Sequence, residues 1–139
     1  MADIKRPYLY TGAVALAANA VGQIPFQITA DFDYFLTGFT YNSTVSNAND
    51  IPYFSIQLQS NEDRIFSDWI PARVFAGMTA ELSTAPDTRY PVGLANWFMF
   101  DCPYPFPQKA TMIWNLRNDL ATAHAITIVT KGYRVYPRR

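Results

Sequence analysis

Hydrophobic and polar residues alternate along much of the chain, a pattern typical of β-strands that bury one face. In "FSIQLQS", the apolar residues Phe54, Ile56 and Leu58 share one face, and the polar residues between them share the other. The turn cluster "SNED" follows, and an extended pattern then resumes, so residues 53–69 are predicted to form a hairpin. Pro71 is expected to end the second strand or to place it at a sheet edge.

The opening segment "YTGAVALAANAVGQIPFQ" is rich in alanine, but its apolar residues alternate with small ones, and Gly12 and Gly22 bracket the run. This spacing favours a pair of strands over a helix. Further strand-like runs bring the total to about eight: "DYFLTGFTYNSTV", "NWFMF", "KATMIWNLRN" and "AITIVTKGYRVY". The prolines at 103–107 are expected to separate two of these strands, and residues 78–93 are predicted to form a long surface loop.

Regularly spaced strands without a long amphipathic helix predict an all-β fold, an antiparallel β-sandwich or jelly roll of about eight strands. The length of 139 residues is that of one ordinary domain. Half of the residues are hydrophobic and only 16% are charged, a composition that excludes a disordered chain. We therefore expect a single β-sandwich domain over residues 1–139, with short tails at 1–10 and 136–139.

Charge and cysteine content exclude several kinds of partner. Eleven basic and eleven acidic residues leave no net charge, so the chain lacks the positive field of a nucleic-acid-binding protein. Cys102 is the single cysteine, which excludes an internal disulfide and a cysteine-based zinc site, and we expect it to be a small buried side chain. No segment has the length and apolarity of a membrane span or the pattern of a secretion signal, so the chain is expected to stay soluble where it is made.

Catalytic candidates are few. His124 is the single histidine, so any serine or cysteine nucleophile would depend on it, and its place at the start of a strand favours a surface or strand-end residue over a catalytic base. Asp31 and Asp33 have a spacing that would suit a metal or a carboxylate pair, but they lie where a strand ends, which favours capping or turn hydrogen bonds. The sequence therefore predicts no enzyme, no metal and no cofactor.

Tryptophans raise the alternative of a sugar-binding platform, because aromatic faces stack on carbohydrate rings. Trp69, Trp97 and Trp114 are the three candidates. Trp97 and Trp114 lie inside apolar strand runs, where packing in the core is the better explanation.

Aromatic residues are also the main sign of assembly. Ten Phe, nine Tyr and three Trp supply more ring surface than a core of this size is expected to hide. In "DCPYPFP", alternating prolines hold Tyr104 and Phe106 in an extended segment that cannot join a sheet centrally. These rings either close the end of the sandwich as a lid or contact another subunit.

Both ends of the chain are basic and carry tyrosines. A tail of this kind offers planar charge and apolar area to a partner, although a solvated tail is the alternative. The predicted interface residues are Lys5, Arg6, Tyr104, Phe106, Arg134, Tyr136, Arg138 and Arg139.

The order of features resembles small head-associated proteins of tailed bacteriophages. It runs from "YTGAVALAANAVGQIPFQITADFDYFLTGFTY" through "FSIQLQSNEDRIFSDWIPARVFAG" and the proline-rich loop to "MIWNLRNDLATAHAITIVTKGYRV". The resemblance spans most of the chain and rests on the pattern rather than on one exact motif. Decoration or cement proteins of this group are similar to jelly rolls that reinforce the capsid from outside, often as trimers, and they imply no catalytic residues.

These observations together predict a structural virion protein, made in the host cytoplasm and bound to the outer capsid surface. Its expected partners are the major capsid protein or another virion protein, and other copies of itself in a homo-oligomer for which the resemblance implies a trimer; nucleic acid and membranes are not expected. The alternative from another class is a carbohydrate-binding module or a neck or tail accessory protein of a receptor-binding apparatus.

Overall fold

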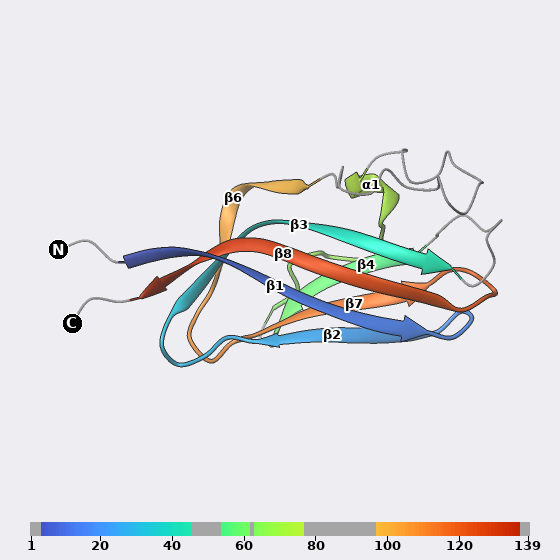
Figure 1. The fold of residues 1–139 in the computed structure, drawn as a ribbon, viewed down its shortest axis with the longest axis horizontal. Coiled ribbons are helices and arrows are strands. Elements are labelled where there is room, and N and C mark those ends of the chain that lie inside the picture. The colour runs from blue at the N-terminus through green and yellow to red at the C-terminus, as the bar shows by residue number, and fades with distance from the viewer. Residues whose placement is uncertain (1–3, 46–53, 62, 77–96, 137–139) are drawn as a thin grey trace.

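The computed structural model describes residues 4–45, 54–61, 63–76 and 97–136 (Figure 1). These residues form strands and one short helical turn, and all strand pairs are antiparallel. The elements are β1 (Ile4–Leu16), β2 (Val21–Gln27), β3 (Asp33–Val45), β4 (Phe54–Ser60), β5 (Ile70–Pro71), α1 (Arg73–Ala76), β6 (Phe98–Phe106), β7 (Thr111–Asn118) and β8 (His124–Tyr136). The predicted all-β sandwich is confirmed.

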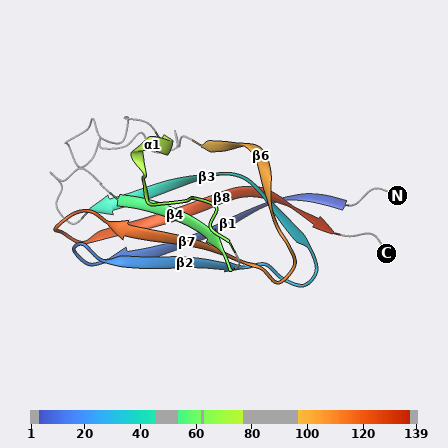
Figure 2. The same ribbon diagram turned by 180° about the vertical axis from the view of Figure 1, so that it is seen from behind.

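Two four-stranded sheets make up the sandwich. The first has the order β1-β8-β3-β6 and the second the order β2-β7-β4-β5. β1 pairs with β8, β2 with β7, β3 with β6 and β4 with β5, so the chain is one long hairpin wound into two layers, which is the topology of a jelly roll. Figure 1 shows β1 and β8 in front, and Figure 2 shows the same fold from behind.

Most strands that follow one another in the sequence belong to different sheets, and β4 and β5 are the exception. β1 and β2 are both strands, as the alternation predicts, but they do not form the expected pair because each pairs with a strand from the other end of the chain. The predicted hairpin at 53–69 is also shorter than expected. After β4 the chain makes one bridge between Gln59 and Arg64 and returns to pair with β4 only at Ile70–Pro71.

Prolines mark the edges of both sheets. Each of the four edge strands described contains at least one, and the four central strands contain none. The edge prolines are Pro7 in β1, Pro25 in β2, Pro71 in β5, and Pro103 and Pro105 in β6. Proline has no N–H to give to a second neighbour, so it is tolerated only where one side of the strand is unpaired.

The proline-rich segment is thus part of an edge strand, and the prediction that residues 103–107 form a turn is wrong for residues 103–106. Tyr104 and Pro105 lie opposite Leu36 and Phe35, and Phe106 lies opposite Tyr34. A bulge between Met99 and Tyr104 bends β6 sharply (Figure 1) and leaves the residues at its apex exposed.

The chain ends are also more ordered than expected. Residues 4–10 belong to β1 and pair with β8 as far as Tyr136, so the predicted tails at 1–10 and 136–139 shrink at least to 1–3 and 137–139, which lie outside the described residues. The predicted loop at 78–93 lies outside them as well.

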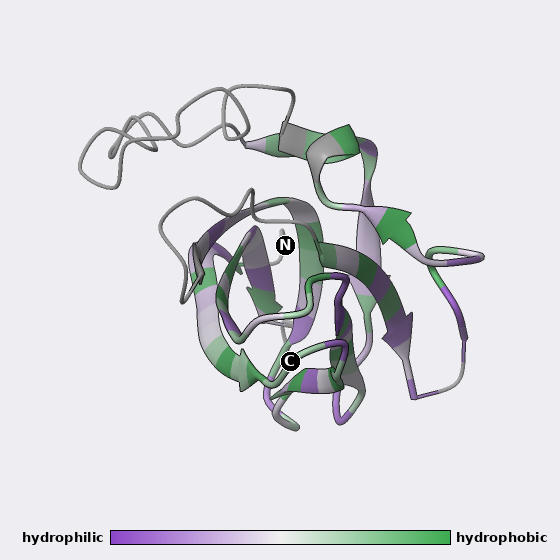
Figure 3. Cartoon of the chain, turned by 90° about the vertical axis from the view of Figure 1, so that its right-hand side faces the viewer, coloured by the Kyte–Doolittle hydropathy of each residue, from purple (hydrophilic) through white to green (hydrophobic). Residues whose placement is uncertain are grey.

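Most of the aromatic side chains are used inside the sandwich. Phe39 is fully buried, and five other rings lie around it, belonging to Phe66, Phe75, Phe98, Phe100 and Trp114. Seen along the long axis, apolar and polar residues alternate along the strands (Figure 3), as expected where one face of each sheet packs inward. Within the described chain Trp97 is the only exposed aromatic residue, so the ring excess mainly fills the core.

Candidate interaction surfaces

Two arginines meet at the end of the first sheet that carries both termini. β1 and β8 extend past the second sheet there (Figure 1), where Arg6 is exposed and Arg134 is half-buried. Arg6 lies directly opposite Arg134 across the β1–β8 ladder, and Ile4 lies opposite Tyr136. We call Arg6 and Arg134 the arginine pair.

Aromatic rings hold the arginine pair in place. The Cζ atom of Arg134 lies 3.3 Å from the centroid of the Tyr8 ring and 4.5 Å from that of Phe32. Its Nη1 donates a hydrogen bond of 3.3 Å to the Tyr136 hydroxyl. The Cζ atom of Arg6 lies 5.5 Å from the Tyr136 ring centroid. Stacking of this kind suits a planar guanidinium and fixes its orientation.

Among the described residues, no acidic group neutralises the arginine pair. Within the described residues neither guanidinium forms an ion pair, and the buried Nε of Arg134 makes no hydrogen bond of full geometry, although Arg134 interacts with the Tyr10 hydroxyl and opposes the rise in its pKa. Like charges directly opposite one another destabilise a sheet, and a buried donor without an acceptor costs further stability. The arginine pair therefore lowers the stability of the free chain.

Two tyrosines support this end from within the sandwich. Tyr34 is fully buried, its hydroxyl lies 3.2 Å from the Tyr8 carbonyl oxygen, and burial raises its pKa to about 12. Burial also raises the pKa of Tyr10, against the opposing effect of the positive charge of Arg134. Gly132 makes room for this packing, because a Cβ there would overlap the Phe35 carbonyl oxygen and lie 2.6 Å from the Tyr34 hydroxyl. Both hydroxyls stay protonated and neutral at neutral pH, so they do not offset the arginine charge.

The structure divides the residues predicted as an interface. Arg6, Arg134 and Tyr136 come together, whereas Lys5 points to the opposite, outer face, where its Nζ lies 5.5 Å from the Tyr133 ring centroid. Phe106 is fully buried in the core and offers nothing to a partner, because its side of β6 faces inward.

Three further predicted residues lie apart from the arginine pair. Tyr104 is half-buried and lines a groove of about 350 Å³ with Asn61 and Asp63. Arg138 and Arg139 lie outside the described residues.

A second surface, which the sequence analysis missed, crosses the outer face of the first sheet. Register places Pro7, Tyr133, Phe35 and Pro105 in one row across the four strands, and Leu9, Lys131, Gly38 and Met99 in the next. We call the large apolar residues of these rows, together with Trp97 beside Lys131, the outer stripe: Pro7, Leu9, Phe35, Trp97, Met99 and Tyr133.

The outer stripe is apolar yet accessible. Leu9 is 53%, Met99 47% and Trp97 38% exposed. The Phe35 and Tyr133 rings stack with centroids 5.2 Å apart, and the Nζ of Lys131 lies 5.5 Å from the Trp97 ring centroid. The apolar run at 34–36 could have revealed this surface from the sequence. Apolar and polar residues alternate in a strand that has one buried face, whereas a strand with apolar residues on both faces has an unbroken apolar run.

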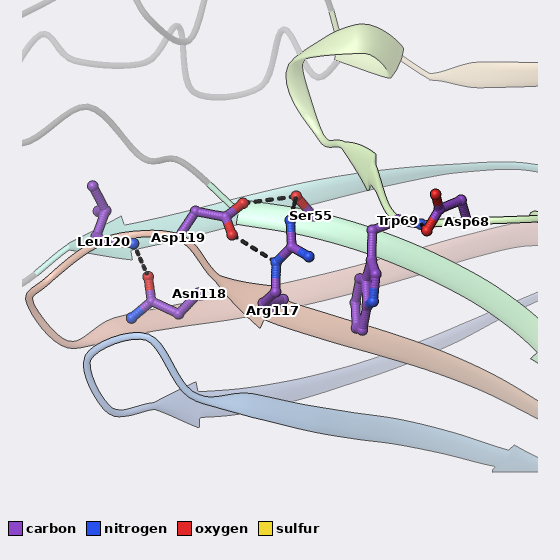
Figure 4. Close-up of polar contacts among 7 residues, drawn as sticks. All are labelled: Ser55, Asp68, Trp69, Arg117, Asn118, Asp119 and Leu120. Carbon is purple, nitrogen blue, oxygen red and sulfur yellow. Dashed lines mark hydrogen bonds and ion pairs between the residues drawn. The ribbon is translucent and has the colours of Figure 1, made fainter.

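The outer face of the second sheet differs because its polar groups satisfy one another. Asp119 forms an ion pair of 2.7 Å with Arg117 and accepts a hydrogen bond of 2.7 Å from Ser55, and Arg117 also lies over the Trp69 ring (Figure 4). Asn115 accepts a hydrogen bond from Gln23, which lies opposite it on β2. These contacts explain the polar residues of this face without a partner.

The remaining candidates for chemistry are structural. His124 stands at the start of β8, as expected, but it is buried rather than on the surface, and its ring meets Phe54 edge to face. Asp33 accepts a hydrogen bond from the backbone N–H of Gln108, which agrees with a role in a turn. Among the described residues, no group of three or more histidine, cysteine or acidic side chains could hold a metal ion.

Two expectations about burial are wrong. Cys102 is exposed, because it lies at the apex of the β6 bulge and not in a regular strand. Trp97 is exposed, because it precedes β6 and lies over the outer face, whereas Trp114 is fully buried, as expected.

Within the part of the chain that the structure describes, no helix has the length and apolarity to cross a bilayer. Comparisons with protein-family models, curated proteins and solved structures found no match to this chain.

Proposed function

We propose that this chain is a structural virion protein of a tailed bacteriophage that binds the outer surface of the capsid as a homo-oligomer and reinforces it. The observation that carries this proposal is the arginine pair, in which two oriented guanidiniums lie at the protruding end of the first sheet and form no ion pair with the described residues. A binding role accounts for an arrangement that lowers the stability of the free protein.

The chemistry of the arginine pair indicates the kind of partner. A guanidinium makes two parallel hydrogen bonds to a carboxylate, and stacking on tyrosine rings reduces the rotamer freedom lost on binding. An acidic side chain on the major capsid protein or another virion protein would neutralise both arginines at once. The surrounding rings of Tyr8 and Tyr136 would supply apolar contact.

The proposal is tested by co-sedimentation of the purified chain with DNA-filled capsids of the phage that encodes it. The Arg6→Gln and Arg134→Gln double variant should bind at least about tenfold more weakly, because it removes both charges while keeping polar side chains of similar length. Arg64→Gln is the matched control, since Arg64 is exposed and belongs to the other sheet, where it forms a bridge with Gln59 of β4. Equal binding by all three proteins would refute docking through the arginine pair.

Single variants separate orientation from charge. Arg134→Lys keeps the positive charge but loses the planar stacking on Tyr8 and the paired hydrogen bonds, so we expect it to bind almost as weakly as Arg134→Gln. Binding should also weaken as salt rises from 50 to about 500 mM, because exposed charges are screened. Sedimentation with tails or necks instead of heads would assign the protein to the accessory role.

Among the described residues, the carbohydrate-binding alternative is best served by the groove lined by Tyr104, Asn61 and Asp63, where a ring lies beside polar side chains. The outer stripe suits a sugar poorly, because Phe35 covers one face of the Tyr133 ring and Lys5 lies over the ring from the β1 side. Binding on a glycan array that is lost in Tyr104→Ala would favour this alternative over the capsid role.

A further inference from the structure

Self-association through sheet edges is disfavoured by the edge prolines. An added strand needs a row of N–H and C=O groups, and proline interrupts that row in every edge strand described. A second copy would therefore have to use a face of a sheet. Of the two outer faces, the first carries the apolar outer stripe, whereas the polar groups of the second are already hydrogen-bonded.

Little side-chain bulk stands above the sheet in the Gly38 row of the outer stripe. Gly38 contributes no side chain to its row, and a Cβ at this position would lie only 2.7 Å from the sulfur of Met99. The side chain of Met99 thus lies down over the sheet, and Lys131 and Trp97 approach each other across the same strand. A surface of this shape matches the face-to-face packing of sheets at about 10 Å.

The charged residues at the margin of the outer stripe can pair with those of a second copy. Lys5 lies on β1 at one side of the sheet, and Asp33 lies on β3 toward the other side, in the same cross-strand row with Val135 between them. Two rows further along the outer face, Leu9 on β1 and Met99 on β6 occupy the two opposite sides of one row. A half-turn about an axis parallel to the strands would exchange these sides while keeping the rows aligned.

We infer that a second copy of this chain covers the outer stripe by such a two-fold contact, with Leu9 of each copy over Met99 of the other and Lys5 facing Asp33. Leu9 and Met99 then meet as apolar groups, Lys131 of each copy lies over Gly38 of the other, and opposite charges meet at the rim, in a self-complementary homodimer interface. This inference deepens the homo-oligomer part of the proposed function. It implies a dimer, or an even-numbered assembly built from dimers, since a two-fold contact cannot close a trimer.

Sedimentation equilibrium tests the inference on the full chain. Leu9→Glu and Met99→Glu should each raise the dimer dissociation constant at least about tenfold, because a charge would be buried against an apolar surface. Val21→Glu is the matched control: Val21 is 59% exposed but lies on β2 of the other sheet, so its dimer should match the wild type. A monomeric or trimeric wild-type chain, or a dimer that only the control weakens, would overturn the inference.

Disulfide trapping tests the geometry. Leu9 and Met99 are separated by three strand spacings, about 14 Å, which is too far for a disulfide within one copy. In a Cys102→Ser background, needed because Cys102 is exposed, the Leu9→Cys and Met99→Cys double variant should therefore form a covalent dimer on mild oxidation. The Leu9→Cys and Val21→Cys double variant should not form a covalent dimer. Equal cross-linking of the two double variants would overturn the two-fold arrangement.

The dimer and the capsid contact can fail separately. The Arg6→Gln and Arg134→Gln variant should remain dimeric while losing capsid binding, because both arginines face away from the outer stripe. Loss of the dimer in this variant would overturn the assignment of the interface to the outer stripe. If Arg64→Gln binds capsids as weakly as the double arginine variant and both proteins remain dimeric, the result would count against the proposed function alone.

Discussion

The two arginines on central strands show how environment separates a structural from a binding role. Arg117 on β7 has its charge matched by Asp119 at 2.7 Å, with Ser55 completing the group. Arg134 on β8 is held by aromatic rings and by the Tyr136 hydroxyl, with no carboxylate in the described chain. Both side chains are stacked on a ring, so the two sites differ in the carboxylate, which Arg117 has and Arg134 lacks. This difference favours a binding partner for Arg134 and a structural role for Arg117.

Tyr34 provides a test of packing at the residue scale through pH. Its folded-state pKa is raised to about 12, chiefly by burial, whereas the ordinary pKa of tyrosine is 10, so the unfolded chain loses this proton first as the pH rises. The stabilisation is complete below pH 10 and is lost between pH 10 and 12. Between pH 9 and 11, wild type should lose about 1.4 kcal/mol more unfolding free energy than Tyr34→Phe.

Urea unfolding of both proteins at pH 9, 10 and 11 measures this difference, and comparison with Tyr34→Phe cancels the titration of other groups. At pH 7 the same variant should cost only about 1 kcal/mol, the value of the hydrogen bonds that Tyr34 makes with the Tyr8 carbonyl and Thr130. Parallel pH profiles for the two proteins would show that the Tyr34 hydroxyl is not desolvated.

At the scale of elements, the edge prolines are predicted to protect against aggregation. Pro25→Thr supplies β2 with an N–H on the exposed edge of the second sheet and should change the unfolding free energy by less than about 1 kcal/mol. It should nevertheless speed aggregation at 40 °C, followed by light scattering. Pro107→Thr is the control, because Pro107 is exposed but lies outside the strands. Equal aggregation rates for the two variants and wild type would remove the protective role.

The ends of β1 and β8 set where the chain can be shortened. Removal of residues 1–3 leaves the described pairing of β1 intact, so the thermal midpoint should change by less than about 2 °C. Removal of residues 1–6 also takes away the pairs of Ile4, Lys5 and Arg6 with β8 and should lower the midpoint by several degrees, about 4–8 °C per kcal/mol lost. Calorimetry of both truncations decides whether this end is a strand or a tail.

At the scale of the whole molecule, the last strand completes the first sheet. β8 lies between β1 and β3, and β7 lies between β2 and β4, so neither sheet can close before the C-terminal part is made. Pairing between the two ends of the chain predicts slow folding, on the order of milliseconds to seconds. A chain ending at Asn118 lacks β8 and should show no cooperative urea transition.

A peptide of residues 119–139 should restore that transition when added to the truncated chain, because it can insert as the missing central strand. Circular dichroism during urea titration, with and without the peptide, measures the rescue. A cooperative transition in the truncated chain alone would contradict the central role of β8.

Local pattern determined the elements of this protein. Alternation of apolar and polar residues predicted the strands around 54–60 and 124–136, and the lack of a helical period predicted an all-β domain, because these features depend on neighbours along the chain. Pro71 was correctly placed at an edge for the same reason, since a missing N–H limits pairing whatever the partner is.

Tertiary structure decided everything that depends on which strands become neighbours. Phe106 and Tyr104 share one local pattern, yet only the pairing of β6 with β3 buries the first and leaves the second half-buried. Arg6 and Arg134 are 128 positions apart, so only the β1–β8 register could bring them together. The outer stripe likewise draws on β1, β3, β6 and β8 with the residue that precedes β6, because an apolar surface across a sheet is a property of register and strand order, which no single segment encodes.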